Sequence, residues 1–265
     1  MEKLWGNIIP YWNDEYIENE ETQPRIPTIT AYPANSKGAV VVFAGGAYAM
    51  RAPYEGYDYA KWLQGIGITA FVVDYRVAPY KHPTQISDAI RAVRYARYYA
   101  DKYGYDKNKI AVMGSSAGGH LAGSVSVHFD KKMYDATDEI DNEDCRPNAT
   151  ILCYPVIDML EYRHDGSRQN LLGERVLHEM KEFMSLYKQV SRDTPPAFIW
   201  HTSFDQAVPV ENSLLYADAL SKKHIPFELH IYPFGQHGLG LADDMPHVAQ
   251  WKKSLENWLM LLEWK

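Results

Sequence analysis

Short apolar runs alternate with amphipathic segments along most of the chain. The run "GAVVVFAGG" at 38–46 is continuously β-branched and ends in glycines, which is typical of a strand buried on both faces of a sheet. Residues 26–34 instead alternate apolar and polar positions, as a half-buried strand does. These patterns predict strands at 26–34, 38–46, 68–76, 109–114, 149–156, 196–203 and 227–235.

The segments between these runs have helical periodicity. Within 84–104 the apolar residues Ile86, Ala89, Ile90, Val93 and Ala96 follow helical spacing, with Arg91, Arg94 and Arg97 on other faces and Gly104 as the stop. Helices are also predicted at 55–65, from Ala117 onwards, at 210–223 and in the C-terminal segment 247–265. Strands that alternate with helices indicate an α/β fold, with a mostly parallel sheet covered by helices on both faces.

Two segments interrupt the alternation. Residues 130–144 carry seven acidic and two basic side chains, so we expect a solvated surface excursion there. Residues 158–194 form a partly helical insertion between two predicted strands, and an insertion placed in this way often covers an active site. We expect one domain over residues 1–265.

Composition narrows the range of partners. The net charge of −7 argues against a nucleic-acid partner, because phosphate binding needs clustered Lys and Arg, and favours a small neutral substrate. No segment has the pattern of a signal peptide or a membrane span, so we expect a cytoplasmic protein with Cys145 and Cys153 as free thiols. We expect the C-terminal helix to pack on its own sheet, with packing on another subunit as the alternative, and the sequence predicts no oligomeric state.

A glycine-rich turn carries the strongest chemical signal. The sequence Gly114-Ser115-Ser116-Ala117-Gly118 joins a predicted buried strand to a predicted helix and has the G-x-S-x-G form of a nucleophile elbow. Such a turn lifts one serine hydroxyl off the strand end, and glycines two residues away on either side keep side chains out of the crowded backbone. Ser115 is the competing nucleophile, but only Ser116 has both glycines, so Ser116 is the predicted nucleophile.

A serine hydroxyl becomes nucleophilic when a histidine takes its proton, and a carboxylate must hold that histidine. Asp205 follows the strand at 196–203 and His237 follows the strand at 227–235, so the chain supplies both in the order Ser, Asp, His. Asp158 also follows a strand and is the alternative acid. The other histidines considered have positions that suit the role less well: His82, His120, His164, His178, His201 and His230. We expect His120 to be a packing or hydrogen-bonding residue behind the nucleophile.

The remaining requirement is a pair of backbone donors for an oxyanion. The glycine-rich loop after the strand at 38–46 offers the N–H groups of Gly46 or Ala47, and the start of the elbow helix offers that of Ala117. No His, Cys or acidic spacing suggests a metal site, and the chemistry needs no cofactor.

These blocks together resemble the α/β-hydrolase superfamily, in particular the esterase branch that includes acetylxylan esterases. The resemblance rests on "FAGGAYAMRAPYEGYDYAKWL", "VMGSSAGGHLAGS", "YPVIDM" and "ELHIYPFGQHGLGLA", among others, and runs through almost the whole length. Two departures are visible: Ala44-Gly45-Gly46-Ala47 stands where relatives often have His or Pro followed by three glycines, and Ser115 stands where many have Phe. Asp74, Tyr75, Arg76 and Asp88 fit the family pattern as framework residues.

The resemblance implies a serine carboxylic-ester hydrolase that removes acetyl groups from xylo-oligosaccharides or related sugars. The alternatives are a generic short-chain or feruloyl-type carboxylesterase, a prolyl-peptidase-like enzyme and a non-catalytic binding protein of hydrolase fold. The intact set of Ser116, Asp205 and His237 argues against the last of these. Glu55 could approach the substrate, although a salt-bridged structural role is the stronger expectation.

Overall fold

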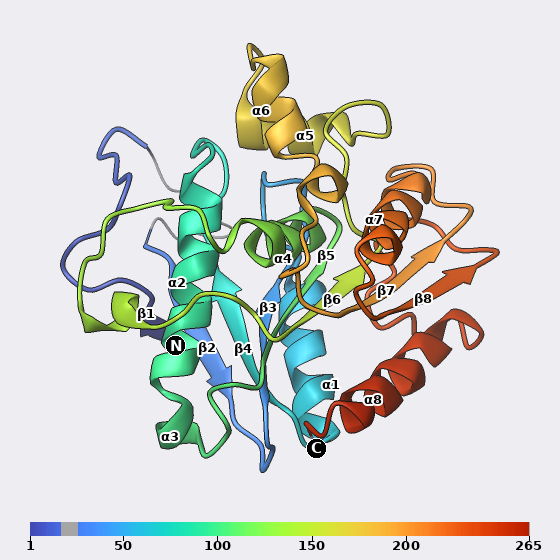
Figure 1. The fold of residues 1–265 in the computed structure, drawn as a ribbon, viewed down its shortest axis with the longest axis horizontal. Helices are drawn as coiled ribbons and strands as arrows, with labels where there is room; N and C mark the ends of the chain where they lie inside the picture. The colour runs from blue at the N-terminus through green and yellow to red at the C-terminus, as the bar shows by residue number, and fades with distance from the viewer. Residues whose placement is uncertain (17–25, 265) are drawn as a thin grey trace.

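One eight-stranded sheet organises residues 1–16 and 26–264, the part of the chain that the computed structural model describes (Figure 1). The strand order is β1-β2-β4-β3-β5-β6-β7-β8. β2 is antiparallel to both neighbours, and all the other pairs are parallel, as the sequence predicts. The strands are β1 (Glu2–Lys3), β2 (Thr28–Tyr32), β3 (Ala39–Phe43), β4 (Thr69–Asp74), β5 (Ile110–Ser115), β6 (Ala149–Cys153), β7 (Ala197–Thr202) and β8 (Phe227–Tyr232).

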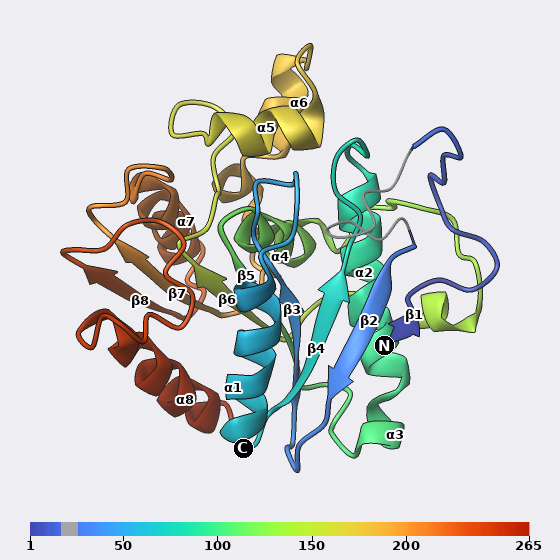
Figure 2. The same ribbon diagram turned by 180° about the vertical axis from the view of Figure 1, so that it is seen from behind.

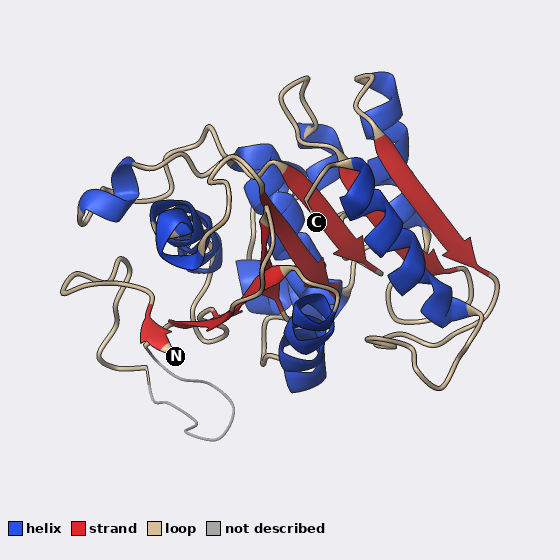
Figure 3. Ribbon diagram, turned by 90° about the horizontal axis from the view of Figure 1, so that it is seen from below, coloured by secondary structure: helices blue, strands red, loops and turns tan. Residues whose placement is uncertain are grey.

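Helices cover both faces of the sheet. Figure 1 shows α2, α4 and α7 over one face, Figure 2 shows α1 and α8 over the other, and Figure 3 shows the layers from below. The α-helices are α1 (Tyr59–Gly65), α2 (Thr84–Tyr98), α3 (Ala100–Tyr103), α4 (Ser116–His128), α5 (Asp165–Leu172), α6 (His178–Phe183), α7 (Glu211–Lys222) and α8 (Trp251–Leu261). The shorter turns are η1 (Tyr54–Asp58), η2 (Glu139–Asn142), η3 (Leu186–Gln189) and η4 (Val248–Gln250).

The central strands are apolar on both sides because a helical layer lies on each. Every residue of β3 and β5 is buried. The C-terminal helix α8 packs on its own sheet, where Trp251 stacks on Trp200 with ring centroids 5.1 Å apart. Lys265, the last residue of that predicted segment, lies outside the described residues.

The acidic segment 130–144 is less solvated than its composition predicts. Asp138 and the buried Asp141 form ion pairs with Arg91, which is only 1% exposed, at 2.6 and 3.0 Å. Arg97 is also buried, and its guanidinium donates to backbone carbonyls, including that of Asp144 at 2.8 Å. The segment therefore covers α2, and the arginines that we predicted on its other faces lie beneath it.

The predicted framework residues anchor the strand ends. The Arg76 guanidinium makes a bidentate pair with Asp88, at 2.9 and 2.7 Å, and both side chains are buried. The Tyr75 hydroxyl donates to the carbonyl of Ala44 at 2.6 Å, and Asp74 pairs with Arg51 at 3.3 Å. These contacts fix the loop that follows β3.

Two further findings concern the described residues as a whole. No helix among them is both long enough and apolar enough to span a bilayer. Cys145 and Cys153 are both buried free thiols, as predicted.

The insertion at 158–194 consists of α5, α6 and η3, between β6 and β7, and Figure 1 shows α5 and α6 standing beyond the end of the sheet. Two buried histidines of α4 hold its far end. The Nε2–H of His120 donates to the carbonyl of Met184 at 2.9 Å, and that of His128 donates to the carbonyl of Phe183 at 3.1 Å. The predicted structural role of His120 is confirmed by these contacts, because its Nδ1 also accepts from the Tyr48 hydroxyl at 2.8 Å.

Burial lowers the pKa of His120 from 6.5 to about 4, so the unfolded chain binds a proton there that the folded chain does not. The contribution of His120 to the free energy of unfolding is therefore fully present above pH 6.5 and is lost as the pH drops toward 4. When the pH is lowered from 7.5 to 5, we expect protonation of His120 in the unfolded chain alone to lower the free energy of unfolding by about 2 kcal/mol. Urea unfolding of His120→Gln, which can still donate to Met184, should show a shallower pH dependence than wild type.

The matched control is His178→Gln on the exposed surface of α6, which should keep the wild-type pH dependence. An equally steep loss of stability in His120→Gln would contradict this role for the buried imidazole.

Candidate active site

The turn from β5 to α4 has room for backbone only. A Cβ on Gly114 would lie 2.1 Å from the carbonyl oxygen of Gly118, and a Cβ on Gly118 would lie 2.1 Å from that of Phe43. Ser116 itself has a φ of 53°, in the left-handed region that non-glycine residues rarely adopt. The crowded turn therefore holds the Ser116 side chain above the end of β5, and α4 begins at this residue, one position earlier than predicted.

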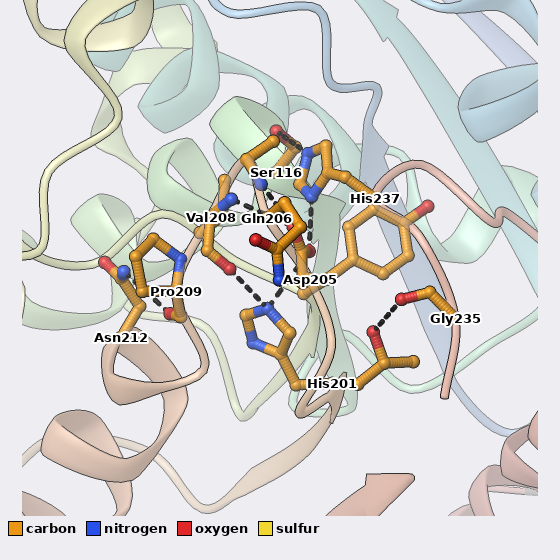
Figure 4. A network of polar contacts seen from close by, with 12 residues as sticks. Ser116, His201, Asp205, Gln206, Val208, Pro209, Asn212, Gly235 and His237 are labelled. Carbon is orange, nitrogen blue, oxygen red and sulfur yellow. Dashed lines mark hydrogen bonds and ion pairs between the residues drawn. The ribbon is translucent and has the colours of Figure 1, made fainter. Parts of the chain in front are cut away.

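The structure brings Ser116, His237 and Asp205 into one hydrogen-bonded row (Figure 4). His237 Nε2 lies 2.8 Å from Ser116 Oγ, and His237 Nδ1 lies 2.6 Å from Asp205 Oδ2. An ionised carboxylate can only accept, so Nδ1 carries the ring proton and Nε2 accepts from the serine hydroxyl. The three residues come from the carboxyl ends of β5, β8 and β7, which share one edge of the sheet.

The Asp205 carboxylate is surrounded by donors. Its Oδ1 accepts from the backbone N–H groups of Ala207 and Val208, both at 2.9 Å. Burial raises the pKa of Asp205, but the hydrogen bonds from His201, His237 and Val208 outweigh burial and hold the pKa well below its usual range. Asp205 is therefore ionised at neutral pH and can stabilise a positive charge on His237.

His201 is a site residue that the sequence interpretation set aside because it lies inside a strand. Its Nε2–H points between the carbonyl of Val208, at 3.0 Å, and Asp205 Oδ2, at 3.3 Å (Figure 4). Its Nδ1 accepts from the Ser213 hydroxyl at 2.7 Å. His201 thus supports the carboxylate on the side away from His237. Its spacing of four residues before Asp205 is the only signal of this role in the sequence.

The alternative nucleophile and acid have structural partners. Ser115 Oγ is buried and lies 2.8 Å from the Tyr59 hydroxyl. The Asp158 carboxylate accepts from Ser185 Oγ at 2.9 Å and from the N–H groups of Leu160 and Tyr162. Asp158 therefore ties the two ends of the insertion together.

Three backbone donors lie free beside the nucleophile. Among the described residues, the N–H groups of Gly46, Ala47 and Ala117 have no hydrogen-bond acceptor. Gly45 packs against the elbow, since a Cβ there would lie 3.1 Å from Ser116 Cβ. The N–H of Gly45 is already used, because it donates to Glu55 Oε2 at 2.7 Å. Gly46, Ala47 and Ala117 are thus the groups available to bind an oxyanion.

The loop that carries these donors is strained and held from several sides. Gly46, Ala47 and Tyr48 have consecutive positive φ values of 125°, 55° and 58°. Asn170 of α5 donates to the carbonyl of Ala47 at 2.9 Å, and the N–H of Ala78 donates to that of Tyr48 at 2.7 Å. Such a conformation persists only where the surroundings impose it, so the insertion helps to shape the donor loop.

His164 of the insertion brings a third imidazole toward the site, besides those of His237 and His201. Its Nδ1 caps α5 by accepting from the Ser167 N–H at 3.2 Å. Its pKa is lowered by burial and then by the charge of His237. Among the described residues, no group of three His, Cys, Asp or Glu side chains could hold a metal ion.

A family model named BD-FAE matches residues 30–220 of the chain. The solved structure of an acetyl ester-xyloside bifunctional hydrolase from Caldicellulosiruptor lactoaceticus is 45% identical, with a TM-score of 0.92 over 99% of this chain and 96% of that one.

Two curated relatives are longer than this chain. Endo-1,4-beta-xylanase B of Butyrivibrio fibrisolvens is 40% identical over 88% of this chain and 38% of its own length. An acetylxylan esterase of Xylanibacter ruminicola is 33% identical over 86% of this chain and 46% of its own length. The chain therefore spans less than half of either relative. On the fold, the family match and these identities together, the chain belongs to the BD-FAE family, within the α/β-hydrolase esterases.

Proposed function

We propose that the protein is a serine esterase that removes acetyl groups from xylo-oligosaccharides or related acetylated sugars. The observation that carries the reaction type is the row from Asp205 through His237 to Ser116, with free N–H groups beside the serine. The names of the relatives support the substrate class, since one is an acetylxylan esterase and another an acetyl ester-xyloside hydrolase.

In the first half of the reaction, Ser116 Oγ attacks the ester carbonyl while His237 Nε2 takes its proton. Asp205 keeps the imidazole in the required tautomer and stabilises the imidazolium. The carbonyl oxygen becomes an oxyanion and accepts from the N–H of Ala117 and from that of Gly46 or Ala47. When the intermediate collapses, the alcohol leaves with the proton from His237.

In the second half, His237 takes a proton from water, and the resulting nucleophile attacks the acetyl group on Ser116. The same donors hold the second oxyanion. When this intermediate collapses, the bond from the carbonyl carbon to Ser116 Oγ breaks and the serine oxygen takes the proton from His237, which restores the starting state. The product leaves as acetic acid, which loses its remaining proton to the solvent and becomes acetate. The cycle requires no metal or cofactor.

Ser116→Ala should lower kcat for p-nitrophenyl acetate by at least about 10⁴-fold, because the attacking oxygen is lost. Ser115→Ala is the matched control, one residue earlier in the same turn. Its hydroxyl contacts Tyr59 rather than His237, so its kcat should stay within about tenfold of wild type. Loss of activity in Ser115→Ala with retention in Ser116→Ala would reverse the assignment of the nucleophile.

The substrate class is tested by comparing kcat/KM for acetylated xylo-oligosaccharides, p-nitrophenyl acetate, p-nitrophenyl butyrate and methyl ferulate. Contacts to the sugar that strengthen in the transition state should give the sugar acetates an advantage of at least about tenfold. Acetate release and p-nitrophenolate absorbance supply the rates. A preference for the butyrate or the ferulate would favour a generic or feruloyl-type esterase and contradict the carbohydrate proposal.

A further inference from the structure

A buried carboxylate lies beneath the donor loop without taking part in the proposed chemical steps. Glu55 belongs to the π-helical turn η1, a kind of turn often found at functional sites, and is 2% exposed. Its Oε2 accepts from the Gly45 N–H at 2.7 Å, and its Oε1 accepts from the Tyr154 hydroxyl at 2.8 Å. The prediction of a salt bridge at Glu55 is wrong, because among the described residues the hydrogen-bond partners of Glu55 are these two neutral donors.

Both contacts of Glu55 are with groups that can donate to it. Gly45 N–H can only donate, and the Tyr154 oxygen already accepts from the Gly240 N–H at 2.9 Å, so its own proton is available to Glu55 or to the Tyr59 hydroxyl, 3.3 Å away. Burial raises the pKa of Glu55 above its usual value, although the bonds from Tyr154 and Gly45 oppose that rise. The Gly45 N–H therefore requires Glu55 Oε2 as an acceptor.

Tyr154 connects this carboxylate to the loop of the catalytic base. Gly240 lies three residues after His237 in the same loop. The Tyr154 ring also meets the His237 imidazole edge to face, with centroids 5.2 Å apart at 74°. Tyr54, the neighbour of Glu55 in η1, packs on this loop as well, since its ring lies 2.9 Å from the position of a Cβ on Gly240. One turn of chain therefore contacts both the donor loop and the base loop.

We infer that Glu55 is a positioning residue that fixes the oxyanion donors of the 45–47 loop relative to His237. Its anchor on Gly45 comes immediately before Gly46 and Ala47, which carry the donors. A displacement of about 1 Å in such a group can cost about 100-fold in rate. The inference rests on the proposed esterase function and adds a residue that this function does not itself require.

The test replaces both acceptor oxygens without a large change of volume. Glu55→Met should lower kcat for p-nitrophenyl acetate by about 100-fold and change KM little, because the donors act mainly in the transition state. Its Kd for an alkylboronic acid, which binds serine as a tetrahedral adduct, should weaken by a similar factor. Glu55→Gln keeps one acceptor for Gly45 and should recover kcat to within about tenfold of wild type.

Asp141→Asn is the control for stability. Asp141 is a buried carboxylate paired with Arg91 and lies outside the candidate site. Its loss should lower Tm while kcat per folded molecule and the Kd of the boronic acid stay at wild-type values. If Glu55→Met does not fold, Tyr154→Phe removes the hydroxyl that bonds Glu55 and Gly240 and lies 3.3 Å from that of Tyr59, and its kcat should fall about tenfold.

Wild-type values of kcat and of the boronic-acid Kd in folded Glu55→Met would overturn the inference and leave the esterase proposal intact. If Glu55→Met does not fold, wild-type values of both quantities in Tyr154→Phe would have the same consequence. The same decline of kcat in Asp141→Asn would also overturn it, because the effect would then belong to stability. Absence of ester hydrolysis by the wild-type protein is a separate result, which would contradict the proposed function itself.

Discussion

The close packing of backbone on backbone at the end of β5 determines where the Ser116 side chain lies. Gly114, Gly118 and the carbonyl of Phe43 approach so closely that no side chain fits between them. Ser116 is held at a φ of 53° by this contact, and α4 starts at once. Because β3 lies beside β5 in the sheet, the same contact also brings the loop after β3 against the serine. The position of the oxyanion donors thus follows from the way the sheet is built.

Electrostatics at the site depend on hydrogen-bond donors more than on cations. Asp205 is held ionised by two backbone N–H groups and two imidazoles, and Glu55 accepts from one N–H and one phenol. A buried charge is costly unless it is well bonded, so each carboxylate constrains the groups around it. Asp205 fixes the tautomer of His237, whereas Glu55 ties the loop of the donors to the loop of the base. The two constraints meet at His237, which in the proposed mechanism needs both a fixed ring and a fixed distance to the oxyanion.

Local patterns predicted the framework of this structure well. The β-branched runs of β3 and β5, and the glycine spacing around Ser116, depend on contacts within a few residues, so the sequence displays them directly. Ser116, Asp205 and His237 each follow a predicted parallel strand, and this was enough to place all three at one edge, because parallel strands end together.

Contacts between distant segments were not predictable in the same way. Nothing local marks the bond from Asn170 to Ala47 or that from Tyr154 to Glu55, since their partners lie 123 and 99 residues away. Arg91 was placed only on another face of its helix, and its burial was not predicted because its ion-pair partner Asp138 lies in a later, acidic segment. His201 was set aside for the same reason: its strand position suggested packing, and its contact with Asp205 depends on how the following loop folds back.

The most direct test of this account is a crystal structure of the protein after reaction with a small alkyl phosphonate ester. Phosphorus should be bonded to Ser116 Oγ, and the phosphoryl oxygen should lie about 2.7–3.1 Å from the N–H of Ala117 and from that of Gly46 or Ala47. His237 should remain within hydrogen-bond distance of Asp205. An adduct on another residue, or a phosphoryl oxygen that faces away from these donors, would contradict the assignment of the site.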